Sequence, residues 1–367
     1  MRHNEAIEEV TYAVGKGQVE FLTAEQPPME PGDVAVSTQY VGVSPGTDGS
    51  FYSGTNIFMT HYRDPRTRKF VERAVPDFAP RKIGYMNTSV DEQGTILGCK
   101  YGYKSGYVLK PADSAVPLPE GMDPLLAVYL AQFGPICANV LAWADIRERD
   151  FLGNVSYMGE SLKDKNVAVW GGGPVGMMTA LMIKRAGGNV ALVDQVPSRL
   201  AIAADFGLHP IDNSDGQAAD KIKGAGLDDA GWSDGADASV FTCGTTELWD
   251  PVFESARPEA VMYDLSFYQG AAKGARLGSY YHHDTPLIQP VQIGHKVHPD
   301  TDPAQFVDKT IDVLRHFPVR EKFVSHIIPV SELDLMFQAL VSRRPELLEE
   351  YAQPGHRDLY QPIGVAA

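Results

Sequence analysis

The sequence is poor in cysteine and lacks long apolar runs. Its 367 residues contain three cysteines, and Cys99, Cys137 and Cys243 include no Cys-x-x-Cys pair, so they cannot build a disulfide framework. No apolar run reaches the roughly 18 residues of a membrane helix. The polar residues 1–9 lack the apolar stretch of a signal peptide. We therefore expect no membrane span and a reducing, cytoplasmic location.

Cationic residues are also scarce. The chain has 32 Lys and Arg against 47 Asp and Glu, a formal net charge of −15. This charge repels nucleic acid and anionic membranes at long range, so we expect neither as a partner. The 44% of hydrophobic residues can build a substantial core, and the length suits two domains. A small-molecule substrate is the expected partner.

What the sequence does have is a glycine-rich turn between two apolar runs. The run 166–170 leads into the turn, and the run 189–193 ends in Asp194, 18 residues after the last glycine. The turn consists of Gly171, Gly172, Gly173, Pro174, Val175 and Gly176. The order strand, glycine turn, helix, strand and acid is typical of a dinucleotide site.

Each part of this pattern has a physical role. Gly171 lets the chain turn sharply, Gly173 lets the backbone approach a pyrophosphate, and Gly176 lets the helix pack on the sheet. The helix N-terminus, where Pro174 and Val175 lie, favours phosphate through its free N–H groups and dipole. Asp194 can accept hydrogen bonds from a ribose diol and would repel a 2′-phosphate, which favours NAD over NADP.

Other residues are expected near the cofactor from their place in the sheet. Ligands of doubly wound sheets lie beyond the carboxyl ends of the strands. Cys243-Gly244 and Ser266 follow two further predicted strands and should flank the nicotinamide ribose, with Cys243 as a packing residue. Arg199, on the helix after Asp194, is either a stacking partner for adenine or a surface arginine.

The organisation of the chain changes at about residue 125. Residues 1–125 read as mostly β, and an apolar helix over 124–144 should be interrupted at Gly134-Pro135. From residue 166 to about 268, strand-like and helical runs alternate, which predicts an α/β domain with a parallel, doubly wound sheet. The predicted strands are 166–170, 189–193, 237–241, 260–265 and 323–330, and the predicted helices are 175–186, 197–206, 215–224, 246–256, 303–316 and 331–341. The tail from Pro354 is expected to wrap the surface.

This order of parts resembles the medium-chain dehydrogenase/reductase family. The resemblance covers nearly the whole chain, and its markers are the glycine turn and the segments 31–34, 41–48, 106–113, 116–121 and 193–207. It implies a Rossmann domain inserted into a GroES-like, β-rich catalytic domain. The implied boundaries are 1–140 and 319–367 for the catalytic domain and 141–318 for the Rossmann domain. A homodimer is expected by resemblance only.

The zinc ligands of that family have no counterpart in this sequence. Ser44, Tyr85 and Gln132 stand where zinc-dependent members carry Cys, His and Glu. Zn²⁺ prefers thiolate, imidazole or carboxylate ligands, and three scattered cysteines cannot form the family's structural zinc lobe. We therefore predict no metal. The alternative is a metal held by an acid with His61, His282 and His283.

Among zinc-free relatives, the segment 43–48 looks most like the bacteriochlorophyllide-type dehydrogenases, which implies oxidation of a secondary alcohol with NAD. Without a metal, a hydroxyl or phenol must stabilise the developing alkoxide and handle the proton. We expect Tyr85 to donate or accept that proton, with Thr47 as a relay and Ser44 and Tyr52 as further candidates. The alternative roles are a packed aromatic for Tyr85 and a turn residue for Thr47.

Two other functions stay open. An enoyl or quinone reductase would share the cofactor site, but those enzymes usually prefer NADPH, which Asp194 disfavours. A dinucleotide-binding redox sensor without catalysis would bind NAD(H) and turn over no substrate.

Two segments look like insertions. About 40 residues separate Ser44 from Tyr85, roughly twice the spacing that the family implies, and residues 55–80 are locally basic. They could form a lid that recognises a large or anionic substrate, or a surface loop or dimer contact. A second insertion, 145–162, has no chemistry that we can assign, although it contains Asn154, Ser156, Tyr157 and Gly159.

Overall fold

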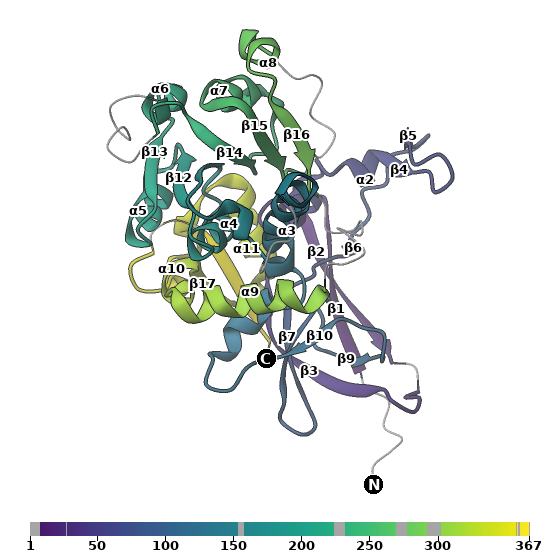
Figure 1. Cartoon of the computed structure of the whole chain (residues 1–367). Coiled ribbons are helices and arrows are strands. Elements are labelled where there is room, and N and C mark those ends of the chain that lie inside the picture. Colours follow the sequence, from purple (N-terminus) through teal and green to yellow (C-terminus); the bar gives the residue numbers. More distant parts are fainter. Residues whose placement is uncertain are drawn as a thin grey trace. The chain divides into compact units, whose positions relative to one another are not determined.

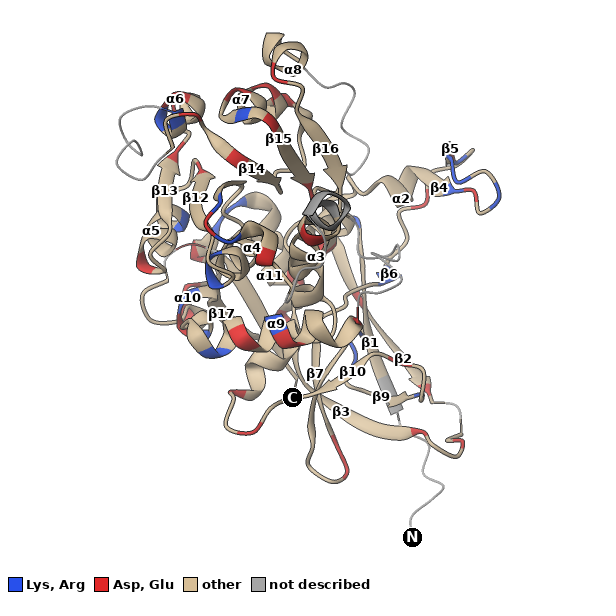
Figure 2. Ribbon diagram, in the orientation of Figure 1, with Lys and Arg blue, Asp and Glu red and all other residues tan. Residues whose placement is uncertain are grey.

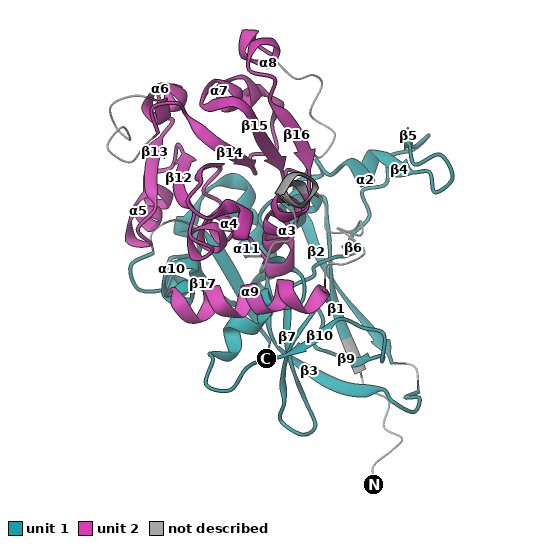
Figure 3. Cartoon of the chain, viewed as in Figure 1, with its two compact units in different colours: residues 1–133, 318–367 teal, residues 134–317 magenta. Residues whose placement is uncertain are grey.

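The computed structural model divides the chain into two compact units (Figures 1 and 3). Unit 1 comprises residues 1–133 and 318–367, and unit 2 comprises residues 134–317. The structure describes residues 8–26, 28–152, 158–223, 232–268, 277–291, 302–356, 358 and 360–366. The first boundary lies seven residues before the one expected from the sequence, because helix α3 (Phe133–Leu152) begins there. None of the described helices is long and apolar enough to span a membrane.

Unit 1 is built on β-sheets. One sheet has the strand order β10-β8-β7-β3-β18-β17, with β9 paired to β3, and a smaller sheet has the order β2-β1-β6. Its strands are β1 (Glu8–Gly15), β2 (Gln18–Glu25), β3 (Val34–Gly42), β4 (His61–Arg63), β5 (Phe70–Glu72), β6 (Arg81–Lys82), β7 (Asn87–Asp91), β8 (Ile96–Cys99), β9 (Gly106–Leu109), β10 (Ala115–Pro117), β17 (Val324–Pro329) and β18 (Gln361–Val365). Its helices are α1 (Thr47–Ser53), α2 (Ile57–Thr60), α10 (Val319–Phe323) and α11 (Leu333–Ser342).

The core of unit 1 joins segments that are far apart in the sequence. Tyr52 of α1 stacks on Phe337 of α11, with ring centroids 5.3 Å apart, and Tyr103 meets the same ring edge-on. Met59 is fully buried in this cluster. The packing fixes α1 and the segment before it on the C-terminal part of the chain.

The C-terminal tail differs from its prediction. Instead of wrapping the surface, β18 lies inside the larger sheet, antiparallel to β3 and parallel to β17. Pro362 cannot donate a ladder hydrogen bond, and the β17–β18 register shifts between Val324 and His326, next to this proline. The irregularity accommodates Pro362 in an interior strand, so a Pro- and Gly-containing tail is buried.

Unit 2 is a parallel, doubly wound α/β sheet with the order β13-β12-β11-β14-β15-β16. Its strands are β11 (Asn166–Trp170), β12 (Asn189–Asp194), β13 (His209–Asp212), β14 (Ala236–Phe241), β15 (Ala256–Asp264) and β16 (Leu287–Pro290). Its helices are α3, α4 (Pro174–Arg185), α5 (Pro197–Asp205), α6 (Ala218–Lys223), α7 (Trp249–Glu254), α8 (Ser279–His283) and α9 (Pro303–His316). The predicted α/β class and its four central strands are confirmed.

The apolar helix is interrupted, but at residues 130–132 and not at Gly134-Pro135, which lie in the first turn of α3, where a proline needs no N–H partner. A 3₁₀ helix, Pro124–Tyr129, precedes α3, and Gln132 lies between the two. Asp123 caps the first segment, since its side chain accepts a hydrogen bond from Leu125 N–H.

Candidate cofactor and catalytic sites

The glycine turn in unit 2 joins β11 to α4. Gly171 has a φ of 106°, a left-handed conformation that favours glycine, and a Cβ on Gly176 would overlap the carbonyl oxygen of Gly171. A Cβ on Gly173 would meet no atom within 4 Å. The backbone at Gly173 therefore borders open space, while Gly176 makes the close contact between helix and strand.

The N-terminus of α4 is suited to an anion. Gly173 caps the helix without a side-chain hydrogen bond, Pro174 occupies the first turn, and that turn contains no acidic residue. Neither the cap nor the first turn, which includes Val175, therefore supplies a side chain that would neutralise the positive end of the helix dipole. This is the feature that a pyrophosphate requires.

Asp194 lies at the end of β12 and its side chain is nearly buried. Its Oδ1 accepts hydrogen bonds from Gln195 N–H (2.8 Å) and Val196 N–H (2.9 Å). Its Oδ2 accepts from Gly172 N–H (2.7 Å) and from Arg199, whose Nη1 is 3.3 Å away. The carboxylate thus holds both the glycine turn and the start of α5, a role that the sequence did not reveal.

Arg199, for which the sequence left open a stacking partner of adenine or a surface arginine, lies on α5 beside Asp194. It forms an ion pair with Asp194 and is about one-third exposed. In this structure its guanidinium is therefore committed to the acid at the end of β12.

The other predicted cofactor residues meet at the carboxyl ends of β14 and β15. Gly244 N–H donates to Ser266 Oγ at 3.2 Å, and Ser266 Oγ donates to the carbonyl of Phe241 at 3.3 Å. Burial raises the pKa of the Cys243 thiol to about 12, and the nearby Asp194 carboxylate adds to this effect. Cys243 therefore stays a thiol, as expected of a packing residue.

Sequence reasoning missed an acid at the same edge. Asp264, the last residue of β15, accepts hydrogen bonds from Ser266 N–H and Tyr268 O–H, each at 2.9 Å. Tyr268 in turn accepts from Trp249 Nε1 at 3.0 Å. Burial raises the pKa of Asp264 above its usual value. An acid directly after an apolar run was the available signal, as it was for Asp194.

Ser44 and Thr47, two predicted catalytic residues, lie together in unit 1 at the start of α1. Ser44 is buried, Thr47 is partly exposed, and Thr47 N–H donates to Ser44 Oγ at 3.4 Å. The Thr47 hydroxyl forms no hydrogen bond with any other described residue. It is therefore free to meet a ligand, as a relay requires.

A buried carboxylate supports this segment. Asp48 Oδ2 accepts hydrogen bonds from Ser44 N–H at 2.9 Å and from the Tyr103 hydroxyl, while Oδ1 has no partner among the described residues. Burial raises the pKa of Asp48 to about 6. Burial and the Asp48 charge raise the pKa of Tyr103, which keeps its proton and acts as donor. Neither role was predicted from the sequence.

Tyr85, the third predicted catalytic residue, lies beside this cluster. It is partly exposed and close enough to Tyr103 to interact electrostatically. The preceding Gly84 has a φ of 100°, and a Cβ there would lie 3.0 Å from the backbone of Gly102. The close approach of segments 83–84 and 102–103 thus brings Tyr85 near the hydrogen-bonded pair of Asp48 and Tyr103.

A catalytic zinc does not fit these side chains. Ser44, Tyr85 and Gln132 offer hydroxyl, phenol and amide groups, which are poor zinc ligands. Across the part of the chain that the structure describes, no three His, Cys, Asp or Glu side chains gather closely enough to hold a metal ion. The histidines of the alternative site are engaged locally: His61 Nδ1 lies 2.9 Å from Thr60 Oγ1, and the rings of His282 and His283 contact each other.

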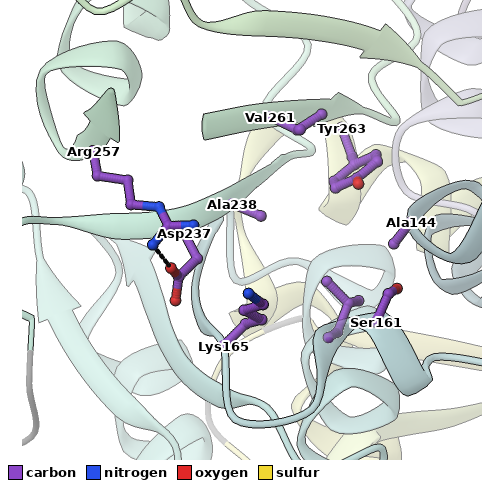
Figure 4. A pocket seen from close by; sticks show the side chains of 9 residues that line it. Ala144, Ser161, Lys165, Asp237, Ala238, Arg257, Val261 and Tyr263 are labelled. Carbon is purple, nitrogen blue, oxygen red and sulfur yellow. Dashed lines mark ion pairs between the residues drawn. The ribbon is translucent and has the colours of Figure 1, made fainter. Parts of the chain in front are cut away.

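A small cavity of about 60 Å³ lies in unit 2, away from the glycine turn (Figure 4). Lys165, Asp237 and Arg257 line it at the amino ends of β11, β14 and β15. Arg257 and Asp237 form an ion pair at 2.6 Å, and Asp237 also accepts a hydrogen bond from Asn166 N–H. The cavity is at the opposite ends of the strands from Asp194, so it does not belong to the dinucleotide cradle.

The second insertion is anchored where the structure describes it. Asp145 accepts hydrogen bonds from Gly159 N–H at 2.6 Å and from both the N–H and the hydroxyl of Ser161. Asn154, Ser156 and Tyr157 lie outside the described residues.

Comparison with known proteins gives a partial sequence match. No family model matches the chain. It is 30% identical to L-threonine 3-dehydrogenase of Rhizobium rhizogenes over 123 residues, which are 33% of this chain and 31% of that protein. The match thus spans about a third of the curated relative.

Solved structures match over the whole chain. Galactitol-1-phosphate dehydrogenase from Escherichia coli has a TM-score of 0.70 and 14% identity, covering 97% of this chain and 99% of that one. A putative zinc-binding dehydrogenase from Sinorhizobium meliloti, bound to NADP, has a TM-score of 0.67 and 14% identity, covering 98% and 99%. A protein described as a short-chain alcohol dehydrogenase from E. coli CFT073, complexed with NADH, has a TM-score of 0.64 and 16% identity, covering 98% and 99%. The chain therefore has the fold of the medium-chain dehydrogenases, in which a Rossmann-like α/β unit is inserted between two parts of a β-rich unit.

Proposed function

We propose that this protein is a medium-chain type dehydrogenase that transfers hydride between NAD(H) and a secondary alcohol or its ketone, without a catalytic zinc. The observation that carries the proposal is the cradle of unit 2, where open backbone at Gly173, an uncapped α4 and the acid Asp194 adjoin. The relatives and structural neighbours are dehydrogenases, and two of the neighbours hold NADP or NADH.

The residues of unit 2 fit a nicotinamide dinucleotide. The N–H groups at the start of α4 would hold its pyrophosphate, and Asp194 would accept a hydrogen bond from the adenosine ribose while keeping its bonds to Gly172 and Val196. Its charge would disfavour a 2′-phosphate, which supports NAD over NADP. The bound cofactor would supply the hydride chemistry.

The residues of unit 1 would handle the proton. Tyr85 donates a proton to the developing alkoxide or accepts one from the alcohol, and Thr47 relays it through a hydroxyl that no described residue engages. Asp48 and Tyr103 hold the Ser44–Thr47 segment in place. Because the donor set Ser44, Tyr85 and Gln132 does not suit zinc, this proton handling takes the place of a metal.

Steady-state assays test the reaction class. The protein should oxidise some member of a panel of secondary alcohols with NAD⁺ and reduce the matching ketone with NADH, with weaker activity with NADPH. Reduction of activated alkenes without any alcohol oxidation would show an enoyl or quinone reductase instead. NADH binding without turnover on either panel would indicate a redox sensor.

A further inference from the structure

The cavity of unit 2 that lies away from the glycine turn has both charged and apolar walls. Its charged residues are Lys165, Asp237 and Arg257. Figure 4 shows the Asp237–Arg257 ion pair on one side of the cavity and Ala144 and Tyr263 on the other, with Lys165 between them. All of the lining residues belong to unit 2, so the site is complete within that unit.

An irregularity in β15 brings Arg257 to this cavity. The register between β14 and β15 shifts between Ala236 and Ala238 of β14, where β15 contains more residues than its partner. Residues 257–260 form the resulting bulge, and Glu259 within it has a φ of 64°, a left-handed conformation that is unfavourable for a residue other than glycine. The bulge takes Arg257 out of the regular ladder, and such bulges are enriched beside functional sites.

The acid of the cavity wall is fully engaged. Asp237 is the single charged residue of β14, and Figure 2 shows this acidic position on the strand. Its Oδ1 lies 2.6 Å from Nη1 of Arg257, and its Oδ2 accepts a 2.6 Å hydrogen bond from Asn166 N–H. Asp237 therefore neutralises Arg257 and leaves the other cation of the wall without a counter-ion.

That other cation is Lys165, which comes directly before β11. Its main chain is fixed, because its N–H donates to the carbonyl of Leu162 at 3.2 Å and its carbonyl accepts from Asn189 N–H at 2.8 Å. Its side chain is partly exposed and forms no ion pair or hydrogen bond with any residue in the described part of the chain. One positive charge at the cavity is thus uncompensated, and a monoanion would balance it.

The second insertion supplies another part of the wall, through Ser161 and Leu162. Asp145 Oδ1 accepts hydrogen bonds from both the N–H and the hydroxyl of Ser161, at 3.1 and 2.7 Å. Because the hydroxyl proton of Ser161 is used in this way, it is not available to an anion. The donors left for a ligand are the amine of Lys165 and those N–H groups of Arg257 that do not bind Asp237.

The volume and the apolar walls of the cavity limit the chemistry of its ligand. The volume is about 60 Å³. One water requires about 10–15 Å³ of such a cavity, so about four or five non-hydrogen atoms fit. The aliphatic lining residues, which offer no hydrogen-bond donor, are Ala144, Leu162, Ala238 and Val261. Phosphate would leave oxygens unpaired against them, whereas a carboxylate has two oxygens for the cations and a hydrocarbon tail for the aliphatic wall.

We propose that this cavity is a binding site for a short-chain carboxylate of about the size of propionate. The carboxylate binds Lys165 and Arg257, and the tail packs on the aliphatic side chains. The charged residues of the site lie at the amino ends of the strands, opposite to Asp194. The proposal is therefore independent of the cofactor and of the reaction in the proposed function.

Titration of the full chain with sodium propionate, followed by ligand-observed NMR at constant ionic strength, tests the proposal. We expect saturable binding with a dissociation constant of about 1 mM, because a ligand of so few atoms is limited to weak affinity. Lys165→Met keeps most of the aliphatic stem and removes the charge. It should weaken propionate binding by roughly ten-fold or more, the usual effect of losing a hydrogen bond to a charged group.

Lys163→Met is the matched control. Lys163 is exposed, lies two positions before Lys165 and does not line the cavity, so the control should bind propionate as the unmodified chain does. Thermal unfolding checks that both variants are folded. Their NADH affinity should equal that of the unmodified chain, which separates a failure of this proposal from a failure of the cofactor site.

Amine footprinting of the unmodified chain does not depend on any variant. The protein is treated with an N-hydroxysuccinimide ester of acetate, with and without saturating propionate, and acetylation of each lysine is followed by mass spectrometry. We expect propionate to slow the acetylation of Lys165 several-fold and to leave that of Lys163 unchanged. Absence of saturable propionate binding, equal affinity of the two variants, or equal acetylation of Lys165 with and without propionate would each overturn the proposal. Binding of inorganic phosphate that depends on Lys165, without binding of propionate, would overturn the assignment to a carboxylate.

Discussion

The main-chain N–H of Gly172 donates a 2.7 Å hydrogen bond to Oδ2 of Asp194. This bond ties the glycine turn after β11 to the end of the neighbouring strand β12. The acid that would bind the adenosine ribose therefore also positions the main chain of the glycine turn that would bind the pyrophosphate. The preference for NAD over NADP and the conformation of the glycine turn thus depend on the same side chain.

Replacing this acid should impair binding in two ways. We expect Asp194→Ala to weaken NADH binding by roughly ten- to a hundred-fold, because hydrogen bonds to a charged group contribute about 1.5–3 kcal/mol. The preference for NADH over NADPH should also shrink. Fluorescence titration with NADH and with NADPH measures both the affinity and the preference. Asp212→Ala is the matched control, since Asp212 lies beside Asp194 on the neighbouring strand and its carboxylate also accepts a hydrogen bond from a following main-chain N–H. If Asp194→Ala kept the same preference for NADH over NADPH, that would contradict the role of Asp194.

Two glycines of the turn should respond differently to substitution by alanine, one in stability and the other in cofactor binding. Gly176→Ala would force a Cβ onto the carbonyl of Gly171 and should lower stability by about 1–3 kcal/mol, the usual cost of overpacking. Gly173→Ala meets no atom within 4 Å and should leave stability unchanged but weaken NADH binding. Thermal unfolding and NADH titration separate the two; full NADH affinity in Gly173→Ala would mean that the pyrophosphate does not approach there.

The phenol of Tyr85 is the predicted proton donor. Tyr85→Phe should lower kcat by about a hundred-fold or more, the usual size of general acid–base catalysis, with the dissociation constant for NADH unchanged. Tyr107→Phe is the control, because Tyr107 is a buried tyrosine of the same unit that bonds to Ser89 and Asn87. It should lose stability and keep kcat. A Tyr85→Phe variant with normal kcat would assign Tyr85 to packing.

Stability should depend on pH through His326. This residue is buried on β17, and burial lowers its pKa from 6.5 to about 4. Below pH 6.5 the unfolded chain binds a proton that the folded chain does not, so stability should fall as pH drops from 6.5 to about 4 and then level off. The expected loss is about 3 kcal/mol. The stability of His326→Gln, measured by urea unfolding at several pH values, should lack this dependence on pH. An identical loss of stability on acidification in that variant would contradict the assignment to His326.

Asp48 opposes this effect in the same range. Burial raises its pKa from 3.8 to about 6, so the folded chain binds the proton more tightly and stability should rise as pH falls from 6 to 3.8. Asp48→Asn removes this gain. The loss of stability on acidification should therefore be steeper in Asp48→Asn than in the unmodified chain, which urea unfolding at several pH values measures.

Much of unit 2 could be predicted because its local signals agree. The runs 166–170 and 189–193 are apolar, end in a glycine turn and an acid, and appear as β11 and β12; the helix predicted at 303–316 is α9. The strands that were missed are short and contain proline. β13 has four residues including Pro210, and β16 ends in Pro290. Strands this short, with a proline, show too few alternating apolar residues to be recognised in the sequence.

The tail and the catalytic segment show what sequence alone could not supply. β18 contains Pro362 and Gly364 and lies inside a sheet only because β3 and β17 flank it, a long-range arrangement. The bonds from Ser44 and Tyr103 to Asp48 likewise join residues up to 55 positions apart. The family resemblance identifies Ser44, Thr47 and Tyr85 as candidates, but tertiary packing decides which side chains support them.

The central claim is hydride transfer between NAD(H) and an alcohol or ketone without zinc. It is tested most directly by measuring the metal content of the purified protein together with its NAD⁺-dependent oxidation of secondary alcohols, before and after treatment with a chelator. The account predicts turnover in a preparation without stoichiometric zinc and no loss of rate with the chelator. One zinc per chain, with activity that the chelator abolishes and zinc restores, would contradict it.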